Sequence, residues 1–80
     1  MLNNELSSLK VGDTAVIVSL SAETSLEQRL LALGFRVGKE VQIIRKAWLS
    51  GPLHVRVGTT EVMVRRRDAK AIKVTNCKVY

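Results

Sequence analysis

Few side chains in this 80-residue sequence are suited to covalent chemistry. It has one histidine, His54, and one cysteine, Cys77, and no serine, cysteine or carboxylate stands from His54 at a spacing typical of a catalytic triad or an acid–base pair. A divalent transition metal needs several convergent histidine, cysteine or carboxylate ligands, and these two residues supply too few. We therefore predict that the protein is not an enzyme and holds no metal ion.

The glycines do not form a phosphate-binding loop. Gly34 and Gly38 are interpreted as a helix end and a turn, whereas a phosphate loop joins a strand to a helix N-terminus. We predict no bound cofactor and expect any nucleotide chemistry to belong to a partner.

The strongest electrostatic feature is the run Arg65-Arg66-Arg67, with Arg56 on the preceding segment. Thirteen Lys and Arg against 7 Asp and Glu give a net charge of +6, which is typical of chains that meet an acidic protein, a nucleic acid or an anionic membrane. No aromatic ring is interleaved with the run, as base stacking would require. We favour a docking patch for an acidic protein surface, and keep a nucleic-acid-binding face and a solvated face as alternatives.

Two large apolar residues, Trp48 and Leu49, precede the break at Gly51-Pro52. In a loop, such side chains either close one end of the fold or contact a partner. We favour closure for Leu49 and partner contact for Trp48. The candidate partner-binding residues are Arg29, Arg36, Trp48, Arg56, Arg65, Arg66 and Arg67.

These residues depend on a frame of short strands, which β-branched and apolar runs predict. The first of these runs, residues 14–20, is nearly continuously apolar, which favours a strand near the barrel centre that is covered on both faces. The predicted strands cover residues 14–20, 40–47, 53–57, 62–66 and 72–74.

The third and fourth predicted strands form a hairpin with residues 58–61 as its loop. Pairing Val57 with Val62 and Val55 with Val64 points the valines inward. His54, Arg56, Met63 and Arg65 then point outward, with Arg56 and Arg65 diagonal to each other on one face.

A change in the spacing of apolar residues predicts a short helix within residues 24–35 (TSLEQRLLALGF), because Leu26, Leu30 and Leu33 recur at helical spacing and would dock on the barrel. Gly34 supplies a left-handed end. The candidate capping boxes at the start are Thr24 with Glu27 and Ser25 with Gln28.

A helical turn at residues 68–71, capped by Asp68, precedes the last strand, and residues 75–80 are predicted to be a loose tail. Five short strands, a turn before the fifth and a short α-helix inserted between strands 1 and 2 predict a mainly β fold, a small five-stranded SH3-like barrel. We expect residues 1–80 to form a single domain.

The chain shows no signal peptide over residues 1–9, and no run approaches the about 20 apolar residues of a membrane span. A lone cysteine excludes an internal disulfide, as expected in a reducing compartment. We predict a cytoplasmic protein without direct membrane insertion.

A further pattern runs along nearly the whole chain: Leu9, Val11-Gly12-Asp13, residues 28–35 (QRLLALGF), Val37-Gly38, Val41, Gly51-Pro52-Leu53, Ala69 and Ile72. In their order and spacing, these residues resemble the ferrous iron transport protein A (FeoA) family. The resemblance implies a cytoplasmic accessory protein of bacterial ferrous iron uptake. Its implied partner is the membrane ferrous iron transporter with a cytoplasmic GTPase domain.

Two alternatives stay open beside this resemblance. One is a small basic KOW-like barrel that binds nucleic acid, which we do not expect to be the partner. The other is a detached regulatory domain of a metal-dependent repressor. The sequence does not determine the oligomeric state, the face that binds or the direction of the effect on a transporter.

Overall fold

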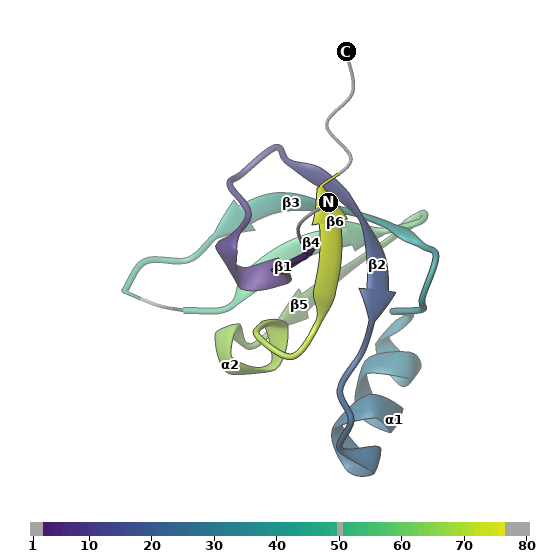
Figure 1. Cartoon of the computed structure of the whole chain (residues 1–80). Helices are drawn as coiled ribbons and strands as arrows, with labels where there is room; N and C mark the ends of the chain where they lie inside the picture. The colour runs from purple at the N-terminus through teal and green to yellow at the C-terminus, as the bar shows by residue number, and fades with distance from the viewer. Residues whose placement is uncertain (1–2, 50, 77–80) are drawn as a thin grey trace.

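The computed structural model describes residues 3–49 and 51–76, which form one antiparallel sheet, two helices and a 3₁₀ turn (Figure 1). Neighbouring strands follow the order β1-β6-β2-β3-β4-β5 within these residues. The elements in chain order are β1 (Asn3–Glu5), η1 (Leu6–Ser8), β2 (Thr14–Ser19), α1 (Thr24–Leu33), β3 (Glu40–Lys46), β4 (Leu53–Val57), β5 (Thr60–Val64), α2 (Arg66–Ala69) and β6 (Lys73–Asn76).

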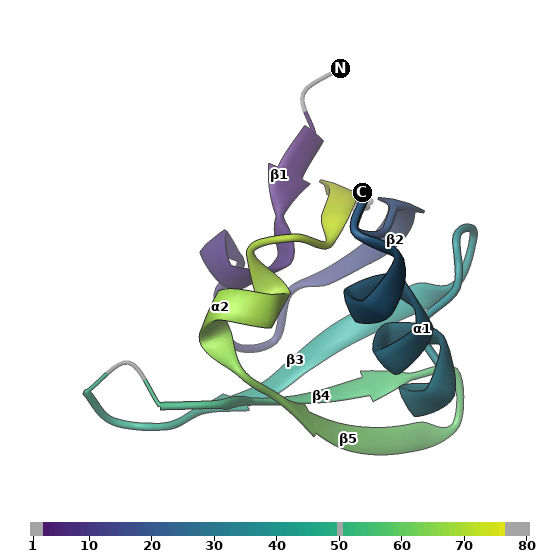
Figure 2. The ribbon, with the colours of Figure 1, turned by 90° about the horizontal axis from the view of Figure 1, so that it is seen from below.

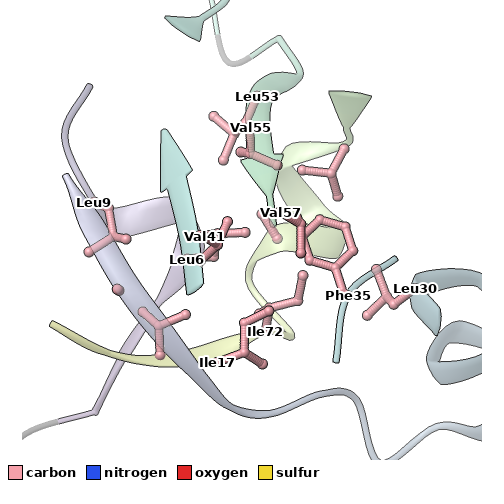
Figure 3. Close-up of a cluster of buried hydrophobic side chains, with 14 of the residues drawn as sticks. Leu6, Leu9, Ile17, Leu30, Phe35, Val41, Leu53, Val55, Val57 and Ile72 are labelled. Carbon is pink, nitrogen blue, oxygen red and sulfur yellow. The ribbon is translucent and has the colours of Figure 1, made fainter. Parts of the chain in front are cut away.

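The twisted sheet curves around one apolar core, with α1 at one end (Figures 1 and 2). Figure 3 shows Leu30 of α1 and Phe35 reaching toward Val57 and the strands. No polar or charged residue of the described part is buried. The largest fully buried side chains are Phe35, Leu6, Ile17, Leu30, Ile43, Leu53 and Ile72.

The sheet has six strands within the described residues, so the predicted count of five is wrong while the mainly β class is confirmed. The extra strand, β1, has the sequence NNE and carries no apolar alternation from which a strand is predicted. It forms because it pairs with β6, with Asn4 opposite Val74. The predicted strands 1 and 2 are therefore β2 and β3, and α1 does lie between them.

The C-terminal prediction was partly wrong because Thr75 and Asn76 belong to β6 instead of a tail. They pair with β2, Thr75 opposite Val16 and Asn76 opposite Ala15. This pairing holds the end of β6 against β2. Cys77 and residues 78–80 lie outside the described residues.

The outer face of β2 is not covered, contrary to prediction. Ala15 and Ile17 are buried, but Val16 is half-buried and Val18 is exposed. The sheet forms a single layer around the core, so its outer side meets solvent.

The β4–β5 hairpin pairs two residues away from the predicted register. Val57 lies opposite Thr60 and Val55 opposite Val62, which leaves only Gly58 and Thr59 in the loop. Gly58 has a φ of 63°, and a type II′ hairpin turn needs glycine at this first loop position. Because the shift is an even number of residues, the valines still face inward.

The end of α1 forms as predicted and its start does not. The Gly34 N–H donates to Leu31 O at 3.0 Å and the Phe35 N–H to Leu30 O at 3.1 Å, which is the bonding pattern of a Schellman motif. Neither predicted capping box forms: Glu23 is the N-cap and has no side-chain cap hydrogen bond. Ser21 Oγ instead accepts from the Glu23 N–H at 2.9 Å.

The second helix, α2, begins two residues before the predicted turn. Asp68 lies inside it and makes no cap hydrogen bond, so the predicted capping role is wrong. The Asp68 side chain faces α1 instead, where Arg29 Nη2 lies 4.0 Å from its Oδ1.

Candidate docking surfaces

An open groove of about 200 Å³ lies between α1, β5 and α2. We call it the α1–β5 groove. Its walls combine apolar side chains with two arginines and one carboxylate. The lining residues are Arg29, Leu30, Leu33, Met63, Val64, Arg65 and Asp68.

Helical and extended periodicities place these side chains on the groove. Arg29 and Leu33 stand one turn apart on α1, and Met63 and Arg65 are two residues apart on an extended segment, so each pair shares a face. Leu33 is 38% exposed and Met63 is 56% exposed. Leu33 therefore does not complete the buried leucine stripe that the sequence predicted, and it offers an apolar contact at the surface.

The groove carries a net positive charge. The Arg29–Asp68 pair is long, at 4.0 Å, and the Arg29 side chain is 62% exposed. Arg65 is exposed and has no carboxylate partner among residues 3–49 and 51–76. An apolar surface between two available guanidinium groups suits a segment that carries an apolar side chain beside carboxylates.

Arg56 does not line this groove and belongs to a cluster on the outer face of the hairpin. Its Nη2 donates to Glu61 Oε2 at 2.8 Å, and His54 Nε2 lies 2.9 Å from Glu61 Oε1. The hydrogen bond from Arg56, followed by that with His54, holds the pKa of Glu61 below its ordinary value. The predicted diagonal pairing of Arg56 with Arg65 is wrong, because Glu61 lies opposite Arg56 and neutralises it.

The remaining predicted contact residues are dispersed. Arg66 Nε donates to Gly51 O at 3.2 Å and so ties α2 to the loop between β3 and β4. Arg67 on α2 and Arg36 between α1 and β3 are exposed. The fold thus unites only Arg29 and Arg65 of the seven candidates in one groove.

Sequence reasoning missed Leu33 and Met63 as groove residues. The exposure of Met63 could be predicted, because the alternation of side chains along the hairpin strands already placed it on the outer face. Leu33 offered no such signal, since it continues the helical stripe that buries Leu26 and Leu30.

Trp48 and Leu49 form an exposed tip between β3 and β4. Trp48 is 87% exposed and Leu49 is 92% exposed, so the prediction that Leu49 closes the barrel is wrong. Leu49 has a φ of 56°, in the left-handed region that nonglycine residues seldom adopt. The turn therefore presents both side chains to the surroundings.

The described ranges, 3–49 and 51–76, contain no group of three or more His, Cys, Asp or Glu that could hold a metal ion. In the same ranges, no helix has the length and apolar character that crossing a membrane requires.

Comparison with known proteins identifies the family, because the model of the FeoA domain matches residues 4–76. The chain belongs to the FeoA domain family. An Fe(2+) transport protein A of Campylobacter jejuni is 36% identical over 69 residues, which cover 86% of this chain and 93% of that protein. The predicted resemblance is thus confirmed.

Solved FeoA structures share the fold. FeoA of Stenotrophomonas maltophilia, a prokaryotic SH3 domain protein crystallised with zinc, is 33% identical with a TM-score of 0.76. The match covers 94% of this chain and 91% of that one. The SH3-like class predicted from the sequence is confirmed.

A further relative joins two proteins in one chain. It is a fusion of Fe(2+) transport protein A with the Fe(2+) transporter FeoB in Porphyromonas gingivalis. The FeoA domain is 38% identical to it over 69 residues, which cover 86% of this chain and 8% of the fusion protein. The family is thereby connected to ferrous iron transport.

Proposed function

We propose that this FeoA domain is a cytoplasmic accessory protein of ferrous iron uptake that binds the membrane ferrous iron transporter and its GTPase domain and catalyses no reaction itself. The fusion of a related domain to FeoB carries this proposal. A covalent link keeps two modules at high effective concentration, which is useful when their association matters for activity. A separate chain must reach the same association through its surface.

The α1–β5 groove supports this proposal through its chemistry. Leu33 and Met63 supply apolar area that association would bury, and buried apolar anchors account for most of the binding free energy at such interfaces. Arg29 and Arg65 add charge that attracts and orients an acidic segment. We propose that the groove holds an acidic, partly apolar segment of the transporter's cytoplasmic part.

Two further exposed arginines, Arg36 and Arg67, are proposed as peripheral contacts that affect association more weakly. Arg56 and Arg66 already bond within the domain. We expect their substitution to act mainly on the domain itself.

The test is binding to the full-length transporter in nanodiscs, with and without guanine nucleotide. Met63→Glu places a carboxylate on the apolar wall and should weaken binding at least about tenfold, since hot-spot losses exceed about 1.4 kcal/mol. Val11→Glu is the matched control, because Val11 is 58% exposed and does not line the groove. It should bind as the unmodified domain does.

Two results would count against the proposal. Absence of association in every nucleotide state would remove the accessory role. Salt-steep binding to RNA, without binding to the transporter, would support the nucleic-acid alternative instead.

A further inference from the structure

The loop between β3 and β4, whose exposed tip carries Trp48 and Leu49, lies on the opposite side of the molecule from α1 in both ribbon views (Figures 1 and 2). Trp48 and Leu49 do not line the α1–β5 groove, although one end of the groove adjoins the base of the tip, where Val64 lies opposite Leu53. The groove therefore does not account for the exposure of the tip, which requires an explanation of its own.

The backbone around the tip forms a tight turn that displays both side chains. The Gly51 N–H donates to Trp48 O at 3.0 Å, and the Ala47 N–H donates to Pro52 O at 3.1 Å. Leu49 occupies the left-handed region, where glycine or asparagine would cost less free energy. A turn needed only to connect β3 and β4 has no use for leucine there.

Cationic groups lie near the tip in the sequence, and the one carboxylate of the β3–β4 hairpin, Glu40, is at the far end of β3. Between Glu40 and Glu61 the sequence contains Arg45, Lys46 and Arg56 but no Asp or Glu. The Arg66 guanidinium joins them, because its Nε bonds to Gly51 O at the base of the tip. The tip therefore combines a protruding apolar end with three nearby cations, Arg45, Lys46 and Arg66, which we call the collar. Arg45 is exposed, whereas Lys46 is half-buried and its Nζ also donates to Ser7 O at 3.3 Å.

We propose that this tip binds the surface of an anionic lipid bilayer. Tryptophan favours the interface between headgroups and acyl chains, where its ring is buried and its indole N–H stays hydrated. The collar attracts lipid phosphates, at about 1 kcal/mol per cation near the surface, a factor of about five in affinity.

The observations favour a bilayer over a protein pocket. The apolar residues project from the molecule, and a bilayer surface accepts a projecting apolar group without a complementary cavity. Residues 41–60 contain no Asp or Glu, and the Glu61 carboxylate opposite this segment is already paired with Arg56, so the remaining charge near the tip suits an anionic membrane. This contact is peripheral and differs from a membrane span, but burial of the Trp48 ring at the interface departs from the sequence prediction of no direct membrane insertion. The contact does not depend on the proposed binding to a transporter.

Trp48 makes the test direct, because it is the only tryptophan in the chain. Vesicles of phosphatidylglycerol and phosphatidylethanolamine should shift its emission to shorter wavelength, and brominated acyl chains should quench it. Pure phosphatidylcholine vesicles should do neither. Added salt should weaken the binding to anionic vesicles.

Variants separate the tip from the rest of the surface. Leu49→Asp should abolish vesicle binding while keeping the fluorescent probe, and Arg45→Gln should weaken it about fivefold. Val37→Asp is the matched control, since Val37 is also exposed but lies between α1 and β3. It should bind vesicles normally, and all three variants should unfold at the temperature of the parent protein.

Three outcomes would overturn the proposal: no emission shift with anionic vesicles, an equal shift with phosphatidylcholine, or binding by Leu49→Asp equal to that of the parent. An emission shift produced only by detergent-solubilised transporter would assign the tip to a protein contact and also reject it. Vesicle binding without transporter binding would leave this inference standing and remove the proposed function.

Discussion

Glu61 shows how single residues organise charge on this surface. It accepts from Arg56 and lies within hydrogen-bond distance of His54, both on the neighbouring strand. The hydrogen bond with Arg56 contributes most to lowering its pKa. Because the pKa is lower in the folded protein than in the unfolded chain, the ionised carboxylate stabilises the fold. That contribution is fully present above the ordinary value of 4.5 and is lost as pH falls through the folded-state pKa.

We expect an NMR titration of the Glu61 carboxyl to give a pKa below 4.5. Arg56→Met should raise this pKa more than His54→Phe, since Arg56 provides the larger effect. Lys10→Met, a charge removal in the turn before β2, is the control and should leave it unchanged. An unaltered Glu61 pKa in Arg56→Met would contradict the role assigned to this pair.

Residue chemistry was predictable only in part. The scarcity of histidine and cysteine was evident from composition, and the sequence predicted correctly that His54 and Arg56 share the outer face. Their common partner was not predicted, because the predicted register placed Glu61 in the hairpin loop, whereas the observed register places it in β5 opposite Arg56. Which charges are neutralised depends on strand pairing, and the two-residue periodicity of a strand fixes faces but not partners.

At the scale of an element, the C-terminal end of α1 shows how one glycine ends a helix. Gly34 has a φ of 107°, and a Cβ built there would meet nothing within 4 Å. Any cost of substitution is therefore conformational instead of steric. The following residue, Phe35, is buried beside Leu30 and couples the helix end to the core (Figure 3).

We expect Gly34→Ala to lower the free energy of unfolding by about 1 kcal/mol, measured by urea denaturation. Gly34→Asn should cost less, because asparagine adopts the left-handed region more readily than alanine. If the two variants were equally destabilised, or if alanine had no effect, positive φ would not be what Gly34 contributes.

The two ends of α1 also show why one boundary was predictable. Glycine after the last apolar residue is a specific signal, because few other residues adopt its conformation. At the start, Thr24 and Ser25 both had capping spacing, but the helix begins at Thr24 and so contains both of them. A capping pattern identifies a region, and the local backbone decides which residue is the cap.

At the scale of the molecule, β-branched and alternating apolar runs predicted the mainly β barrel and the inward face of the β4–β5 hairpin. The missing strand, β1, depends on pairing instead of its own sequence, and the Leu6 N–H to Ile72 O bond of 2.8 Å continues that link. The α1–β5 groove was not predictable for a related reason. Its walls are far apart in the chain and only the folded topology brings them together.

The net charge of +6 makes a prediction about the rate at which the domain meets an acidic partner. Long-range attraction raises association rates and is screened by salt, while the short-range contacts that limit dissociation are much less affected. We expect the association rate constant with the full-length transporter to fall about tenfold from low to high salt, with little change in dissociation. Stopped-flow or surface-based kinetics would measure both.

The position of the charge should matter as much as its amount. Arg29→Gln combined with Arg65→Gln removes two charges from the groove and should reduce the salt dependence of association. Lys10→Gln combined with Lys70→Gln removes the same charge from exposed positions that do not line the groove, so it should have the smaller effect. Equal effects of the two pairs would mean that net charge alone steers the encounter and that the groove does not orient it.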